Sequence, residues 1–196
     1  MAFDAFFLSA VLEEVRDRCI GARVDKIHQP SRDALILHLR CKEGREKLLF
    51  AANPTAPRLH LTTSSPENPP EPPMFCMLLR KHLQGARIID ISQKDSERII
   101  EISVETMNEL GFSVSKKIIF EIMGKHSNII FCNEENVIID SIKHVSAHMS
   151  SVREVLPGRD YFIPETVEKL NPLDVNFADF TNVLLSKPTG LSKAIY

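Results

Sequence analysis

The sequence has no tryptophan and only four cysteines, Cys19, Cys41, Cys76 and Cys132, among its 196 residues. No two of these cysteines form the Cys-x-x-Cys pair that zinc sites and redox motifs use. Widely spaced cysteines of this kind favour reduced, mostly buried thiols over a disulfide framework. We therefore expect no disulfide, no metal site and no cofactor.

Long apolar runs are also missing. None approaches the roughly 20 residues that a membrane-spanning helix needs. The first residues, Met1 to Phe7, lack the basic residues that open a signal peptide, and Glu13, Glu14 and Asp17 interrupt the apolar stretch that follows. The sequence therefore predicts a cytoplasmic protein that has no membrane partner.

An excess of positive charge is absent as well. The chain has 24 Lys and Arg against 26 Asp and Glu, a formal net charge of −2. This balance excludes a protein that coats nucleic acid generally, because such proteins carry a broad basic surface. Any binding of nucleic acid must come from a local patch of side chains.

What the sequence does contain is a series of short aliphatic runs between turn residues, with two segments of helical spacing. Helices are expected over 4–18, where Phe7, Ala10, Val11 and Val15 can share a face, and over 74–84. Strands are expected over 23–29, 34–41, 47–52, 58–62, 87–92, 98–104, 116–123, 128–132 and 137–142. This order predicts an α+β fold, mainly an antiparallel β-sandwich flanked by helices.

After Lys143 the pattern loosens, and residues 164–172 have the composition of a connector. Helical spacing returns from Val175, and another helix is expected to start near Gly190. We therefore divide the chain into a first domain over 1–175 and the start of a truncated second domain over 176–196.

Residues that could form an active site do not combine into one. His126 and Ser127 are adjacent, so on a strand their side chains would point to opposite faces. His144 and His148 have the i, i+4 spacing of zinc ligands on a helix, but the serines around them favour a loop. Phosphate-binding glycine motifs are missing. The sequence predicts a protein that is not an enzyme.

Three segments could contact nucleic acid. Arg80, Lys81 and His82 are consecutive on the expected helix over 74–84, where they would hold phosphates or form an ordinary solvated face. Glu97 and Arg98 follow a polar turn, where the carboxylate would orient the guanidinium toward a phosphate or base, or form a weak surface ion pair. The third segment, 124–128, interrupts two apolar strands with a polar loop.

Asp4 precedes the first helix, and its simplest role is that of the N-cap. Within the polar loop, Lys125, His126, Ser127 and Asn128 would form either a binding loop or a simple connection. Gly124 permits the backbone to turn there.

Several of these segments together resemble one protein family. The matching segments, in this order and spacing, are Ile27-His28-Gln29-Pro30, Pro72 to His82, Glu121 to Asn128, Asp140 to His144 and Leu156 to Tyr161. They are similar to the NFACT-N domain of the RqcH/NEMF ribosome quality-control family, whose bacterial members are often labelled fibronectin-binding protein A. The resemblance covers about residues 1–175.

The resemblance implies a fold similar to the N-terminal domain of the formamidopyrimidine DNA glycosylases, followed by a helix-hairpin-helix domain that residues 176–196 would begin. It implies binding to large ribosomal subunits stalled with peptidyl-tRNA. It also implies recruitment of tRNA, in bacteria alanyl-tRNA, for template-free alanine tailing of the nascent chain.

By position, the family's Asp-Arg pair needed for tRNA recruitment falls on Glu97 and Arg98, and its N-terminal acidic residue falls on Asp4. Glu97 departs from the usual Asp by one methylene, which keeps the charge but moves the carboxylate. Two alternatives stay open. A glycosylase-like DNA enzyme would need an N-terminal proline nucleophile, whereas this sequence starts Met1-Ala2-Phe3-Asp4. The second alternative is a fibronectin-binding adhesin, although the sequence has no recognisable signal peptide.

Overall fold

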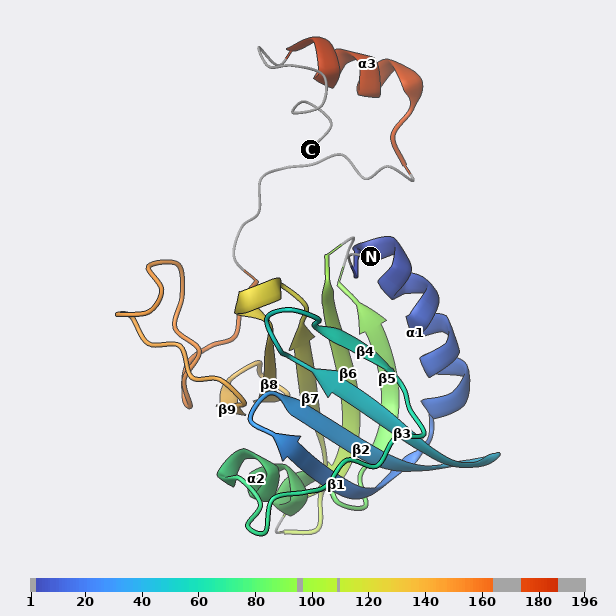
Figure 1. Ribbon diagram of the computed structural model, residues 1–196, viewed down its shortest axis with the longest axis vertical. Coiled ribbons are helices and arrows are strands. Elements are labelled where there is room, and N and C mark those ends of the chain that lie inside the picture. The colour runs from blue at the N-terminus through green and yellow to red at the C-terminus, as the bar shows by residue number, and fades with distance from the viewer. Residues whose placement is uncertain (1–2, 95–96, 109, 164–173, 187–196) are drawn as a thin grey trace. The chain divides into compact units, whose positions relative to one another are not determined.

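The computed structural model describes residues 3–94, 97–108, 110–163 and 174–186 (Figure 1). The chain divides into two compact units, Met1–Ile163 and Pro164–Tyr196. The first unit contains nearly all of the described secondary structure. Among the described residues, no helix is both long and apolar enough to cross a membrane.

Within the described part of the chain, nine strands form one antiparallel sheet in the order β4-β3-β2-β1-β5-β6-β7-β8-β9. The strands are β1 (Arg23–Ser31), β2 (Ala34–Cys41), β3 (Gly44–Ala51), β4 (Arg58–Leu61), β5 (Arg87–Gln93), β6 (Ile99–Met107), β7 (Ser113–Glu121), β8 (Asn128–Asn133) and β9 (Ile138–Ser141). The helices are α1 (Ala5–Cys19), α2 (Met74–Leu83), the short 3-10 helix η1 (Gly124–His126) and α3 (Phe177–Ser186). The α+β class and the antiparallel strands are thus confirmed.

The predicted sandwich is corrected in one respect, because its two layers belong to a single continuous sheet. β1 and β5 pair through Arg23 and Arg87. The Phe50 ring of β3 and the Phe120 ring of β7 meet with their centroids 5.6 Å apart, so the half made of β1–β4 faces the half made of β5–β9. The similarity to glycosylase domains stays a prediction.

The buried face of α1 overlaps the predicted one only in part. Leu8, Leu12, Val15 and Cys19 are buried; of the predicted residues, Val15 is buried and Val11 packs against the core, whereas Phe7 is 44% exposed. Both sets have helical spacing, and only the position of the sheet decides between them. The helix lies against β5, and α2 lies against β1 with Phe75, Cys76, Leu79 and Leu83 buried (Figure 1).

The cysteines behave as predicted. All four are free thiols; three are buried and Cys41 is half-buried. Burial raises the pKa of the Cys19 thiol to about 12, so this group stays protonated and unreactive at neutral pH.

The segment after β9 is joined to the end of β7 by a buried ionic group. The Arg153 guanidinium donates to Glu121 Oε2 at 2.6 Å, and the Tyr161 hydroxyl donates to Glu121 Oε1 at 2.9 Å. Glu121 is buried, and its carboxylate raises the pKa of Arg153 against the opposing effect of burial. This segment therefore belongs to the first unit.

The second unit contains α3, which confirms the helical spacing predicted from Val175. The first compact unit ends at Ile163, upstream of the predicted domain boundary. The assignment of 176–196 to a second domain stays a prediction. The helix expected near Gly190 lies outside the described residues.

Candidate nucleic-acid interface

The turn between β5 and β6 presents Glu97 and Arg98. The Glu97 amide donates to the Lys94 carbonyl at 2.9 Å, and the Lys94 amide donates to the Ile99 carbonyl at 3.0 Å. These two bonds close the turn and direct the chain into β6. Arg98 is exposed and Glu97 is half-buried at the end of the hairpin.

Gln93 joins this turn to the start of α1. Its side-chain amide donates to the Ala5 carbonyl at 3.1 Å and to the Glu97 carbonyl at 3.0 Å. Asp4, one residue before Ala5, is therefore held close to the turn. Figure 1 shows the start of α1 beside the end of β5. The structure thus brings Asp4, Glu97 and Arg98 to one corner of the molecule.

The Arg98 guanidinium forms no hydrogen bond or ion pair with another residue of the described ranges. Glu97 and Arg98, which both lie in the described ranges, form no ion pair with each other. The structure therefore does not show the surface ion pair that the sequence offered as an alternative. The Arg98 backbone is nevertheless fixed, because its carbonyl accepts from the Ile122 amide at 2.9 Å. Arg98 thus combines an anchored backbone with an uncommitted, planar five-donor group.

The segment 124–128 divides into two exposed and two buried residues. Lys125 and His126 are exposed on η1, three and four residues beyond the Ile122 amide that bonds Arg98. Ser127 and Asn128 are buried: Ser127 Oγ accepts from the Met123 amide at 2.9 Å, and Asn128 Nδ2 donates to the Lys143 carbonyl at 2.8 Å. Ser127 and Asn128 therefore brace the fold in this structure, whereas Lys125 and His126 are the solvent-exposed members of the motif. RNA contact by this motif stays a prediction.

Sequence reasoning missed Lys143. Its ammonium donates to the Ser127 carbonyl at 2.9 Å and also to the Ala52 carbonyl, and so ties η1 to the end of β3. Burial lowers the pKa of this amine. The sequence feature that could have identified Lys143 was its position between Asp140 and His144 in a family motif. Its hydrogen-bond acceptors, however, lie far away in the sequence.

The basic residues of α2 lie apart from this corner. Arg80 Nε donates to the Ile27 carbonyl at 2.8 Å, and His82 Nδ1 lies 2.8 Å from the Lys116 ammonium. The Thr106 hydroxyl donates to the His82 carbonyl, and Thr106 is seven residues along β6 from its start, roughly 23 Å at 3.3 Å per residue. Arg80 and His82 therefore hold α2 on the sheet, and Lys81 is the exposed member of the three.

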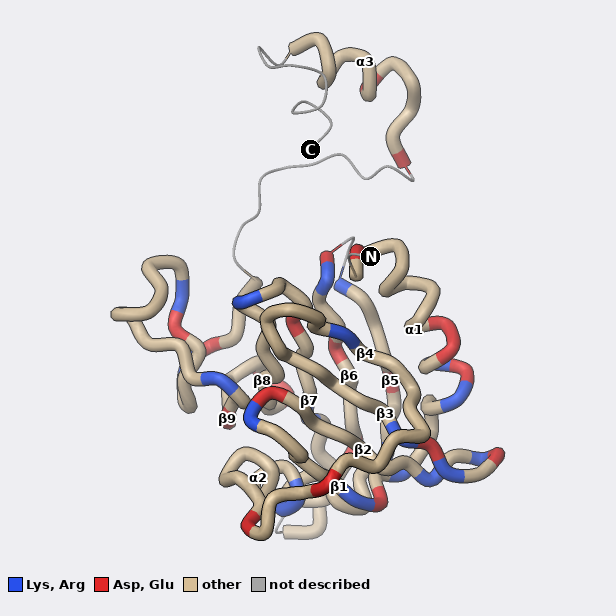
Figure 2. Tube along the Cα trace, viewed as in Figure 1, with Lys and Arg blue, Asp and Glu red and all other residues tan. Residues whose placement is uncertain are grey.

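Among the described residues, the remaining basic residues are interspersed with acidic ones. Figure 2 shows Lys and Arg alternating with Asp and Glu along the strands and helices. His144 Nε2 lies 2.6 Å from Asp140 Oδ1, and His148 lies in a turn, as the serine-rich context predicted. In the part of the chain that the structure describes, no group of three or more His, Cys, Asp or Glu side chains could hold a metal ion.

The comparison with protein families assigns the chain. The model for the NFACT N-terminal and middle domains matches residues 4–196. The chain belongs to the NFACT_N family.

Two curated relatives of this NFACT_N chain carry the name Rqc2 homolog RqcH. The protein of Bacillus subtilis is 43% identical over 196 residues, which is 100% of this chain and 34% of the relative. The protein of Streptococcus pneumoniae D39 is 42% identical over 176 residues, 89% of this chain and 32% of the relative. The chain therefore spans about a third of the length of these relatives.

A solved structure has the same fold. The N-terminal domain of the fibronectin-binding protein PavA from Streptococcus pneumoniae superposes with a TM-score of 0.87 at 36% identity. The match covers 99% of this chain and 77% of that one.

Proposed function

We propose that this chain is the RNA-binding module of a cytoplasmic ribosome quality-control factor. The factor binds large ribosomal subunits stalled with peptidyl-tRNA and recruits tRNA, specifically alanyl-tRNA, for template-free tailing of the nascent chain. Membership of the NFACT_N family and relatives named RqcH at 42–43% identity support the ribosome quality-control role. The module binds and positions RNA and is not itself an enzyme.

The proposed tRNA contact rests on one observation, the corner that Asp4, Glu97 and Arg98 form. A guanidinium whose backbone is fixed, and which no described residue engages, can form two parallel hydrogen bonds to a phosphate or to the edge of a guanine. Glu97 adds an acceptor for a base amino group, and its carboxylate restricts the approach of other anions. Lys125 and His126 extend the same surface along η1.

The test is to replace Arg98 in the protein that carries this chain and to measure the tRNA that copurifies. Arg98→Ala should reduce tRNA affinity by about one to two decades, because a lost hydrogen bond to a charged group costs about 1.5–3 kcal/mol. The melting temperature should stay unchanged, since the side chain is exposed. Arg98→Lys should be only partly active, because lysine lacks the planar fork.

Arg45→Ala is the matched control, since Arg45 is likewise exposed but lies in the hairpin between β2 and β3. Glu97→Asp should have little effect, and Glu97→Ala an intermediate one. A steep fall in melting temperature for Arg98→Ala would assign the residue to the fold. Unchanged tRNA recovery and unchanged stability would move the contact elsewhere, first to Lys81.

A fibronectin-binding role has weaker support. Its support is the shared fold with PavA, and the binding of fibronectin is a property of that protein. Sedimentation with ribosomes, compared with retention on immobilised fibronectin, separates the two functions. We expect the protein to sediment with ribosomes and not to be retained on immobilised fibronectin.

A further inference from the structure

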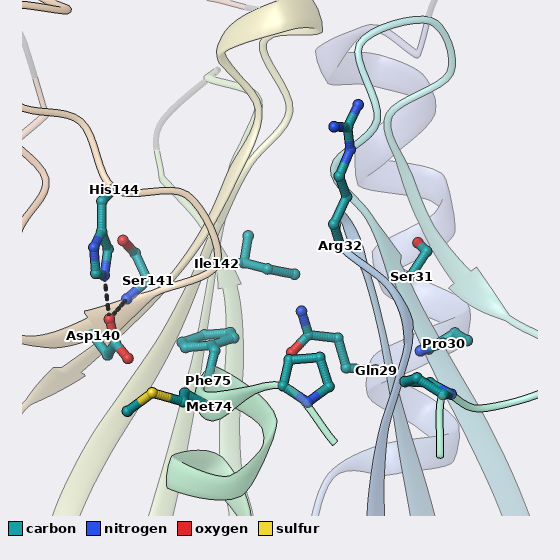
Figure 3. Close-up of a pocket in the computed structure, with 12 residues that line it drawn as sticks. Gln29, Pro30, Ser31, Arg32, Met74, Phe75, Asp140, Ser141, Ile142 and His144 are labelled. Atoms are coloured by element: carbon teal, nitrogen blue, oxygen red, sulfur yellow. Dashed lines mark hydrogen bonds and ion pairs between the residues drawn. The ribbon is translucent and has the colours of Figure 1, made fainter. Parts of the chain in front are cut away.

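A cavity of about 580 Å³ lies between the end of β1, the proline-rich loop before α2, the first residues of α2 and β9 (Figure 3). The proposed tRNA contacts do not use it. Its volume lies within the roughly 300–1,000 Å³ typical of ligand pockets. It is lined by Gln29, Pro30, Ser31, Arg32, Pro69, Pro73, Met74, Phe75, Asp140, Ser141, Ile142 and His144.

The polar centre of this cavity is Gln29. Its side chain is only 5% exposed, and Oε1 is the one fully buried side-chain polar atom without a hydrogen-bond partner among the described residues. Gln29 lies where the β1–β2 register shifts, between His28 and Ser31, so the backbone leaves the regular ladder there. Since buried polar groups are nearly always satisfied, an unpartnered amide oxygen in a cavity indicates a missing donor.

The lining of the cavity is part apolar and part polar. Figure 3 shows Gln29 on one side and Phe75 and Ile142 on the other, and prolines of β1 and of the proline-rich loop complete the apolar part. The polar part includes Asp140, which is paired with His144. Arg32 is exposed at the rim, and its guanidinium makes no hydrogen bond or ion pair with any described residue. An aromatic and proline wall facing a buried carboxamide, with a guanidinium at the rim, fits a flat, polar-edged group attached to an anion.

Hydrogen bonds from Lys143 join the wall of the cavity to η1. Lys143, next to the cavity residues Ile142 and His144, donates to the Ser127 carbonyl at the end of η1. It also donates to the Ala52 carbonyl, and the Ala52 amide donates to the carbonyl of Asp33, which follows Arg32. The backbone segments that carry η1 and Arg32 are therefore held by the same ammonium group.

We propose that this cavity binds an unpaired adenine of the RNA, with Gln29 reading the base edge and Arg32 holding the adjoining phosphate. The inference rests on the proposed RNA-binding function and adds a base-specific contact to it. A glutamine amide pairs with the N6 amino group and N7 of adenine, and the amino group supplies the donor that Oε1 lacks. The corresponding edges of guanine and uracil offer only acceptors to that oxygen. Bases extruded from single strands are read in this way, against apolar and aromatic walls.

The experiment measures the affinity of this chain for short oligoadenylate and oligouridylate of equal length by fluorescence anisotropy at low salt. The unmodified chain should bind oligoadenylate about tenfold more tightly. Gln29→Met, which keeps the length of the side chain but removes the amide, should abolish this preference and leave oligouridylate binding unchanged. Arg32→Ala should weaken both, and Arg45→Ala neither.

Stability gives an independent readout. Because Gln29→Met removes a buried group without a partner, its melting temperature should equal or exceed that of the unmodified chain, so a loss of preference cannot be attributed to unfolding. Equal affinity for the two oligonucleotides would overturn the adenine site while leaving the proposed function intact, provided that Arg98→Ala still loses tRNA. A Gln29→Met variant with unaltered adenine preference would likewise overturn it, because adenine would then be recognised elsewhere on the chain. If neither oligonucleotide nor tRNA bound, both proposals would fall.

Discussion

At the scale of single residues, Asn128 is the clearest case of a motif residue that acts through the fold. It is 2% exposed; Oδ1 accepts from the Ile129 amide at 2.9 Å and from the Lys143 amide at 3.1 Å. Nδ2 donates to the Lys143 carbonyl. One side chain thus satisfies three backbone groups and holds the segment after β9 against the start of β8.

We expect Asn128→Ala to lower the free energy of unfolding by about 2–4 kcal/mol, because it leaves several buried backbone groups without partners. Replacement of the exposed His126 by Ala should change it by less than about 0.5 kcal/mol. Urea denaturation of the two variants makes the comparison. Equal stabilities would show that water replaces the Asn128 bonds and that its role lies elsewhere.

The sequence identified 124–128 as one polar motif but could not divide it. Which side chains turn inward depends on the 3-10 turn at η1 and on Lys143, whose bonds to Ser127 and Ala52 join residues 16 and 91 positions away. The resemblance to the family supplied Asp4, Glu97 and Arg98 as a group. The contact that brings them together, through Gln93, has no recognisable sequence signal.

At the scale of elements, Asp4 has a structural role that must be separated from its proposed RNA contact. Its Oδ1 accepts from the Phe7 amide at 2.8 Å and caps α1, as the sequence predicted. Asparagine can accept the same bond without the charge, whereas alanine cannot. The two substitutions therefore distinguish capping from charge.

Asp4→Ala should lower the free energy of unfolding by about 0.5–2 kcal/mol, and Asp4→Asn should leave it nearly unchanged. If the carboxylate also orients the RNA-binding corner, both variants should recover less tRNA. Thermal melts and tRNA copurification on the same preparations provide the measurement. Full tRNA recovery by Asp4→Asn would limit Asp4 to capping.

The strands were predicted closely because turn residues separate them: β2 has the predicted bounds, while β3 and β7 each begin three residues earlier. Two features escaped prediction. The buried face of α1 was one of two helical stripes, and the continuity of the sheet depends on the β1–β5 pairing, formed between residues 64 positions apart. Local pattern fixes neither, since both depend on tertiary packing.

At the scale of the whole molecule, a net charge of −2 and the alternation of basic and acidic residues along the chain in Figure 2 limit the proposed RNA binding to a few cations. Arg98, Lys125 and Arg32 are the exposed basic residues of the proposed RNA contacts. About three phosphate contacts predict a slope of roughly −2 to −2.7 for log affinity against log salt, because each contact releases about 0.7–0.9 counterion. A broad basic surface would give a much steeper dependence.

Raising salt from 50 to 200 mM should therefore weaken tRNA binding by this chain about 16- to 40-fold. Arg98→Ala should reduce the magnitude of the slope by about 0.7–0.9, and Arg45→Ala should leave it unchanged, because each removes one cation and, of the two, only Arg98 belongs to the proposed RNA contact. Titrations at four salt concentrations measure the slope for each variant. Affinity independent of salt would rule out phosphate contacts, whereas equal slopes for Arg98→Ala and the unmodified chain would show that Arg98 reads a base or contributes nothing. A longer protein in which further RNA-binding modules are linked to this chain should bind more tightly, since linkage raises the effective concentration of each module, but the change in slope at Arg98 should persist.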